Sequence, residues 1–260
     1  MKVLVSGYVG KKITGIGRNI ISLLDNAEDG IEFVVYVNYD MADEFKFKNK
    51  NIIVKTYNVS KDNSMKNLLW TTFKFPKLAK KEKCDIALIP NFTLLLKKKV
   101  PTVVILHDLI EFNIKDKFSK KKMFYRTKIA DPITAKKATH IITVSENSKK
   151  DIMKFLNIKE DKISVIYDGV DLEKFNSNNI SSISLPEKYI LYVGTVDHPG
   201  KNCMNLIKSF ENLKNNNKYD GDLIIAGMPG KGYEVVDEYV KNSKYRNILQ
   251  FVIRFFLHNF

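Results

Sequence analysis

KVLVSGYVGKKITGIGRNIISLLD, residues 2–25, is the stretch that sets the fold of this chain. It opens with a short apolar, β-branched run that is typical of a buried strand. A glycine-rich loop follows, and apolar residues then recur at helical spacing from Arg18 to Asp25. A strand, a glycine loop and a helix in this order build a mainly parallel sheet with helices on its faces. We therefore expect an α/β fold that begins with a Rossmann-like domain.

The same alternation of strand and helix continues along the chain. Longer segments with helical spacing, Lys66–Lys83 and Lys120–Ala138 among them, separate short apolar runs that end in polar or glycine turns. The expected strands after the first are Phe33–Asn38, Ile52–Tyr57, Ile86–Pro90, Thr102–His107, Ile141–Ser145 and Ile163–Tyr167. In such a sheet, ligands gather beyond the carboxyl ends of the strands.

A stretch rich in Asn and Ser divides the chain into two predicted domains. The first is an N-terminal Rossmann-like domain, residues 1–183, whose linker starts at about residue 172. The alternation then restarts with a strand at Tyr189–Val193, and residues 184–260 predict an incomplete second Rossmann-like domain. The tail ILQFVIRFFLHNF, residues 248–260, is expected to add one buried strand, followed by an aromatic remainder without an evident core.

Composition excludes several classes of protein. With 260 residues, of which 44% are hydrophobic and 28% charged, the chain can bury a core and is neither disordered nor fibrous. Cys84 and Cys203 match no metal-ligand spacing, and we expect both as small buried hydrophobes in a reducing cytoplasm. The sequence shows neither a signal-peptide core nor the run of roughly 18 apolar residues that a spanning helix needs.

The net charge of +14 is unevenly distributed. Residues 1–183 hold 33 Lys and Arg against 21 Asp and Glu, whereas residues 184–260 hold 10 against 8. Lysine clusters occur at residues 46–50, 80–83, 97–99 and 120–122. They indicate either an ordinary solvated surface or a patch for peripheral contact with the inner face of an anionic membrane. Nucleic acid is disfavoured as a partner, because Lys far exceeds Arg and no docking motif is present.

Two places in the first domain carry candidate site residues. Gly15 and Gly17 lie at a strand-to-helix turn, where a backbone can approach a phosphate and a helix N-terminus supplies amide donors. A turn of this kind can equally serve geometry alone. His107 and Asp108 close a predicted strand, where the histidine could hydrogen-bond a sugar hydroxyl or a leaving group. The alternatives are a structural histidine, and an aspartate that caps the segment after it.

The second domain offers one candidate phosphate site, in the loop YVGTVDHPGKN after its first strand. Gly194 and Thr195 stand at the expected sheet edge, and Lys201 comes just before a helix. A lysine at a helix start is disfavoured by the helix dipole but suits an incoming diphosphate. This local conflict favours function over an ordinary surface role.

Six segments in order resemble glycosyltransferase family 4: ITGIGRN, LHDL, TVSENSKKDI, VIYDGVD, YILYVGTVDHPGKN and DLIIAGMPGKGYE. The resemblance runs from about Met1 to Arg246. It implies a GT-B fold, with a nucleotide-sugar donor held mainly by the second lobe and an acceptor on the first. It also implies retention of the anomeric configuration without an obligatory metal.

The resemblance assigns roles to individual residues. Gly15 and Gly17 would lie against the donor phosphates, His107 would contact the transferred sugar, and Lys201 would neutralise the diphosphate. Family members often carry Arg directly after the second-lobe glycine or directly before the lysine, where this chain has Thr195 and Gly200. The family's paired-glutamate motif would follow the point where this sequence ends, so the resemblance implies a C-terminally truncated member.

The expected function is transfer of a hexose from a nucleoside diphosphate sugar to a lipid-linked or polysaccharide acceptor with retention, in cell-envelope polysaccharide biosynthesis. The nucleotide sugar is a co-substrate, and neither a cofactor nor a metal is expected. The first alternative is a non-catalytic, truncated or frameshifted fragment of such an enzyme, because RNILQFVIRFFLHNF begins like the family's next strand and then departs from it. A lesser alternative is a basic nucleic-acid-binding protein.

Overall fold

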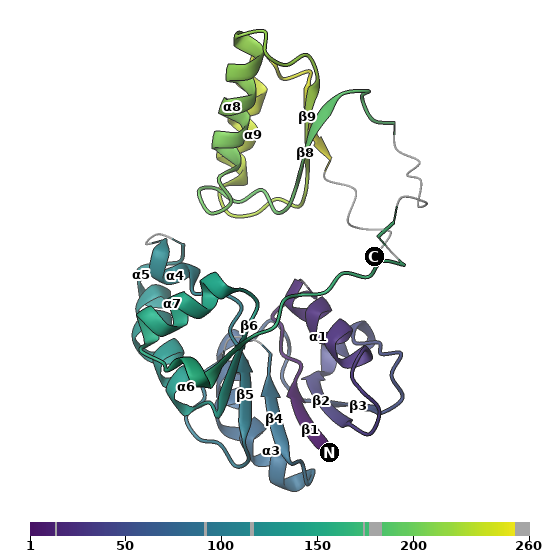
Figure 1. Cartoon of the computed structure of the whole chain (residues 1–260), viewed down its shortest axis with the longest axis vertical. Helices are drawn as coiled ribbons and strands as arrows, with labels where there is room; N and C mark the ends of the chain where they lie inside the picture. Colours follow the sequence, from purple (N-terminus) through teal and green to yellow (C-terminus); the bar gives the residue numbers. More distant parts are fainter. Residues whose placement is uncertain (14, 91–92, 115–116, 174, 177–183, 253–260) are drawn as a thin grey trace. The chain divides into compact units, whose positions relative to one another are not determined.

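The computed structural model contains two compact units, Met1–Val170 and Asp171–Phe260 (Figure 1). It describes the chain except for residues 14, 91–92, 115–116, 174, 177–183 and 253–260. Each unit is a parallel sheet with helices packed on it, so the predicted α/β class is confirmed. Among the described residues, no helix is both long enough and apolar enough to cross a membrane.

The first unit is built on seven parallel strands in the order β3-β2-β1-β4-β5-β6-β7. The strands are β1 Lys2–Ser6, β2 Glu32–Asn38, β3 Ile52–Tyr57, β4 Ile86–Ile89, β5 Thr102–Ile105, β6 His140–Thr143 and β7 Ile163–Val165. The order reverses between β1 and β4, which makes this pair the topological switch point. Because all seven strands are parallel, they end at the same edge of the sheet, which we call the carboxyl edge.

Helices cover the two faces of this sheet. On one face, α1 (Gly15–Asp25) and the short 3-10 helix η1 (Tyr39–Glu44) pack over β1 and β2. The other face carries the remaining helical segments, several of which share a second core cluster. In chain order these segments are α2 Ser64–Leu69, η2 Trp70–Lys74, α3 Phe75–Lys81, α4 Ile110–Asn113, α5 Lys120–Phe124, η3 Tyr125–Ala130, α6 Asp131–Lys137 and α7 Glu146–Leu156, and the short 3-10 helix η4 Glu160–Lys162 leads into β7.

The two longest predicted helices differ from expectation in the same way. Each is an α-helix interrupted by a π-helical stretch, η2 in the first and η3 in the second. Pro76 and Pro132 stand in the first turn of the α-helix that follows each stretch. A proline lacks an N–H group and its ring crowds the carbonyl four residues earlier, so a uniform α-helix cannot pass through it. The wider π turn accommodates the proline without ending the segment.

The second unit is a three-stranded parallel sheet in the order β10-β9-β8. Its strands are β8 Tyr189–Val193, β9 Asp222–Ala226 and β10 Leu249–Val252, and its helices are α8 Cys203–Asn215 and α9 Tyr233–Asn242. Both helices pack on the same face of the sheet (Figure 1). The strand predicted in the tail is present as β10, and the aromatic remainder from residue 253 lies outside the described residues. Cys84 and Cys203 are both free and buried.

Two carboxyl groups are buried near an arginine in the helices that follow β5. Glu111 of α4 and Asp131 of α6 are 2% and 1% exposed. Arg126 of η3 donates from Nε to Glu111 Oε1 and forms an ion pair with it. Burial raises the pKa of Asp131 to about 8; Arg126 opposes this rise, and the neighbouring Glu111 adds to it. The Arg126–Glu111 ion pair thus ties α4, which begins three residues after His107, to η3.

We predict that Asp131→Asn becomes progressively more stable than the wild type as pH rises from about 5 to about 8. In this window the folded wild type keeps a proton on Asp131 that the unfolded chain, with an ordinary pKa, has lost. Wild-type stability therefore falls with rising pH, whereas asparagine does not titrate. Thermal unfolding followed by circular dichroism gives the Tm difference between variant and wild type at each pH. The control is Asp43→Asn, which removes an exposed carboxylate of η1. A Tm difference that grows no more for Asp131→Asn than for the control contradicts the prediction.

Candidate functional site

His107 lies at the carboxyl edge of the first sheet, two residues beyond β5. Its Nε2 is 3.3 Å from the carbonyl oxygen of Pro90, which directly follows β4. The tautomer with the proton on Nε2 donates to that oxygen. The backbone carbonyl of His107 accepts a hydrogen bond of 2.9 Å from Ser148 Oγ of α7. The half-buried imidazole is therefore held beside the switch-point strand β4, where this fold class collects ligands.

Asp108, the next residue, is exposed to solvent. Its Oδ1 accepts a hydrogen bond of 3.2 Å from the backbone N–H of Ile110, the first residue of α4. This short-range bond turns the chain from β5 into α4. The carboxylate therefore serves a turn, and it also remains accessible at the carboxyl edge next to His107.

Gly15 and Gly17 occupy different environments at the start of α1. Gly15 is the first residue of the helix, and a Cβ built there meets nothing within 4 Å. Gly17 is buried, and a Cβ there lies 3.0 Å from Ile13 Cγ2. Gly17 therefore has a packing reason to be glycine, whereas Gly15 leaves open space around the first turn of α1.

Gly7 is a further glycine of this edge, which the sequence analysis did not single out. A Cβ on it lies 2.5 Å from Val37 Cγ1, and its N–H donates to the carbonyl of Tyr36 at 2.8 Å. A side chain there would push the loop after β1 away from β2. Its place directly after the first strand is the signal that could have identified it.

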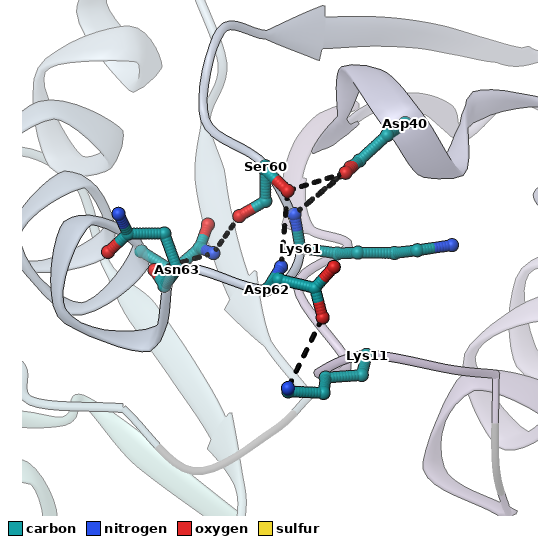
Figure 2. Close-up of polar contacts among 7 residues, drawn as sticks. Lys11, Asp40, Ser60, Lys61, Asp62 and Asn63 are labelled. Carbon is teal, nitrogen blue, oxygen red and sulfur yellow. Dashed lines mark hydrogen bonds and ion pairs between the residues drawn. The ribbon is translucent and has the colours of Figure 1, made fainter.

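A polar network joins the loops after β1, β2 and β3 at the same edge (Figure 2). Lys11, in the loop after β1, forms an ion pair of 3.3 Å with Asp62. Asp40 accepts hydrogen bonds from Ser60 Oγ at 2.8 Å and from the Lys61 N–H at 3.0 Å. The segment that follows β3 is thus tied to both neighbouring loops. No local pattern predicts this network, because its partners are far apart in sequence.

α1 is also bonded to the segment that follows β7, the last strand in the sheet order. Asn19 Nδ2 of α1 donates to Asp168 Oδ1, three residues beyond β7, at 2.7 Å. Asp168 belongs to the segment VIYDGVD, one of the six segments on which the family resemblance rests. The contact therefore ties the helix that starts at Gly15 to the chain leaving the last strand.

The candidate residues of the second unit lie in the loop between β8 and α8. This loop runs alongside the loop after β9, because the Gly194 N–H donates to Ala226 O at 2.9 Å and the His198 N–H to Lys231 O at 2.8 Å. A Cβ on Gly227 would lie only 1.8 Å from Gly194 O. Glycine at position 227 therefore lets the two backbones approach and fixes the position of Gly194.

Thr195 and Lys201 are both exposed in this loop. The Thr195 carbonyl accepts a hydrogen bond from Tyr192 OH at 3.1 Å. The Lys201 N–H donates to Asp197 O at 2.9 Å, and Asn202 with a φ of 56° then leads into α8. Within the described part of the chain, the ammonium group of Lys201 forms no ion pair. A positive charge thus stands in solvent just before the N-terminus of a 13-residue helix.

The predicted site residues fall into two sets, one in each unit. Gly15, Gly17, His107 and Asp108 belong to the carboxyl edge of the first sheet, and Gly194, Thr195 and Lys201 to the β8–α8 loop. Both sets follow the ends of parallel strands, as expected for ligand-binding residues in this fold class. Across the residues that the structure describes, no group of three or more His, Cys, Asp or Glu side chains could hold a metal ion.

Two curated relatives are similar to part of the chain. The N-acetylgalactosamine-N,N'-diacetylbacillosaminyl-diphospho-undecaprenol 4-alpha-N-acetylgalactosaminyltransferase of Campylobacter jejuni is 33% identical over 91 residues, which are 35% of this chain and 24% of that protein. The O-antigen chain mannosyltransferase RfbU of Salmonella typhimurium is 29% identical over 157 residues, 58% of this chain and 41% of that protein. The chain therefore spans less than half the length of these relatives.

A solved structure and a family pattern extend the comparison. HepE of Anabaena, in complex with UDP and glucose, superposes with a TM-score of 0.61 at 15% identity, over 97% of this chain and 69% of that one. At this identity the likeness shows the fold, which is that of the GT-B proteins. The sequence pattern of Glycosyltransferase Family 4 matches residues 14–174, which include the loop at Gly15, the His107 edge and Asp168. Because this match covers more than half of the chain, the chain belongs to Glycosyltransferase Family 4.

Proposed function

We propose that this chain acts in the transfer of a hexose from a nucleoside diphosphate sugar to a lipid-linked or polysaccharide acceptor, with retention of the anomeric configuration. Family membership supports the class of reaction. Both curated relatives are named as glycosyltransferases, one of a diphospho-undecaprenol substrate and one of an O-antigen chain. The observation that carries the donor part is Lys201, whose ammonium group stands in solvent before α8, in a loop whose Gly194 packs against Gly227.

The proposed donor contacts follow from charge and backbone geometry. A diphosphate beside the β8–α8 loop would gain the positive charge of Lys201 and the N-terminal dipole of α8. Since Thr195 and Gly200 replace the arginines frequent in the family, Lys201 supplies the cation in this proposal. The open first turn of α1 at Gly15 would supply amide donors to the same kind of group.

The proposed chemistry relies on positioning and charge stabilisation rather than on a strong base. In a retaining transfer, the bond between the sugar C1 and the nucleoside diphosphate breaks, and an acceptor hydroxyl oxygen bonds to C1 from the same face. The hydroxyl proton passes to the departing phosphate. His107 would hydrogen-bond the transferred sugar, because its ring is held at the carboxyl edge through Pro90. Asp108 is the exposed carboxylate beside it. The proposal includes no obligatory metal, no resident cofactor and no nucleic acid, and places the protein in the cytoplasm.

We predict that Lys201→Ala weakens the binding of a nucleoside diphosphate by on the order of tenfold, because a charge-assisted contact to phosphate is lost. Isothermal titration calorimetry with UDP, GDP and ADP measures the Kd of each. The matched control is Lys218→Ala, which removes an exposed lysine just beyond the other end of α8. Equal affinities of Lys201→Ala and wild type for whichever nucleotide binds would remove Lys201 from the site.

We predict that His107→Ala lowers kcat for sugar transfer by about a hundredfold or more, while the Kd of the nucleotide stays within about threefold of wild type. We expect kcat to change and the nucleotide Kd not to, because His107 is assigned to the sugar and not to the nucleotide. Donor turnover with a lipid diphosphate acceptor gives kcat. His140→Ala is the control. His140 is a half-buried histidine at the N-terminal end of β6, whereas His107 follows the C-terminal end of β5, and the Nε2 of His140 lies 2.8 Å from Ser164 Oγ. A His107→Ala protein with wild-type kcat would refute the assignment.

A further inference from the structure

The helix that follows the His107 turn is too short to hold its own position. α4 has only four residues, and a helix of one turn is not stable in water by itself. Two of its side chains fix it to α7. Phe112 stacks on Phe155, with ring centroids 5.1 Å apart, and Asn113 Nδ2 donates to Asp151 Oδ2 at 3.1 Å. The position of α4 therefore depends on side-chain contacts with its neighbours.

The contact of α4 with η3 is made by a buried carboxyl group. Glu111 Oε1 accepts from Arg126 Nε, whereas Glu111 Oε2 is buried and has no hydrogen-bond partner among the described residues. Both side-chain oxygens of Asp131 are buried in the same condition. Burying carboxyl oxygens without donors is costly. We call Glu111 and Asp131 the carboxyl pair.

A single proton removes most of this cost. An ionised carboxyl group only accepts hydrogen bonds, so the two members of the pair can bond to each other only when one of them holds a proton. Burial raises the pKa of Asp131 to about 8 despite the charge of Arg126, and a hydrogen bond with Glu111 and the charge of Glu111 add to the rise. With one proton the pair carries one negative charge, which the guanidinium of Arg126 balances. A second ionisation buries two like charges beside one arginine.

Other charged groups near the carboxyl pair do not change this balance. Groups of the neighbouring elements that act on its members are Asp108 of the turn before α4, Lys122 of α5, and Tyr125 and Arg126 of η3. The negative charge of Asp108 opposes ionisation of Asp131. Lys122 has a lowered pKa, chiefly because of burial and also because of Arg126. On α7, Lys149 pairs with Glu160 at 2.9 Å. Arg126 is thus the cation that acts most strongly on Asp131.

The carboxyl pair is connected to the candidate site through the backbone. Glu111 follows His107 by four residues, and Asp108 Oδ1 bonds to the N–H group of the first residue of α4. A shift of α4 therefore shifts the turn that carries the two site residues. We propose that the carboxyl pair shares one proton beside Arg126 and thereby positions the turn at His107 and Asp108 for sugar transfer. The positioning role rests on the proposed function, whereas the shared proton does not.

The shared proton is tested on the free protein, without donor or acceptor. The chain has four histidines, so NMR of protein labelled at histidine Cε1 gives few signals, and His107→Ala identifies that of His107. Above about pH 8 the pair loses its proton, and the His107 signal is expected to shift a second time, beyond the titration of its own ring. Asp131→Asn removes this second inflection, because asparagine does not ionise. The exposed-site control Asp43→Asn keeps it, and the His140 signal does not show it.

The positioning role is tested by the pH profile of transfer. Wild-type kcat is expected to fall above about pH 8, whereas Asp131→Asn keeps the neutral form. At about pH 7 the two proteins differ in kcat by less than about twofold, and at about pH 9 the variant is about tenfold faster. A damaged fold does not produce such a gain. Glu111→Gln weakens the tie to Arg126 and lowers kcat about tenfold, while the nucleotide Kd stays within about threefold.

The inference is overturned if the wild type lacks the second inflection, if Asp131→Asn retains it, or if Asp43→Asn loses it. It is also overturned if Asp131→Asn loses kcat above about pH 8 as steeply as the wild type does. A protein without transfer activity that still shows the inflection dependent on Asp131 contradicts the proposed function and supports the shared proton. An active protein without that inflection contradicts the shared proton and leaves the proposed function in place.

Discussion

The parallel pairing of all seven strands in the first unit is the constraint on which the rest of the molecule depends. Parallel strands require a crossover between each pair, so the chain must supply a helix or a long loop after nearly every strand. The same constraint brings every strand end to one edge. His107, the loop after β1 and the segment at Asp168 all lie at that edge for this reason, although they are spread over most of the unit. The reversal of order between β1 and β4 opens that edge at its centre.

The sequence predicts the positions of the strands but not the backbone geometry of the segments that connect them. Each strand of the first unit lies in a short run rich in apolar residues, so its position could be found within one or two residues. The central strands β1 and β2 are buried on both faces, which leaves a continuous apolar signal. The π-helical stretches before Pro76 and Pro132 could not be found, because apolar spacing says where a helix faces but not how its backbone meets a proline. The bonds of Asp40 with residues 60 and 61 depend on tertiary approach, which local patterns do not contain.

The candidate site shows the same division. The sequence does not distinguish Gly15 from Gly17. Their surroundings do, because Gly17 is required by packing against Ile13, whereas Gly15 leaves the helix start open. Gly227 was not singled out, although its contact with the Gly194 carbonyl leaves no room for a side chain. Lys201, by contrast, was singled out from the sequence alone, because a lysine before a helix contradicts the dipole preference. Its role at a phosphate stays a prediction.

Where carboxylates are placed decides which lysines are available to anions. The first unit pairs Lys11, Lys55, Lys61 and Lys149 with acidic partners that lie outside two lysine-rich helical segments, residues 64–81 and 120–137. The acidic residue within those segments is buried in the cluster with Arg126, and the one that follows them is taken by Lys55 and Tyr36. Crowding unpaired lysines on one face costs self-repulsion in the isolated protein.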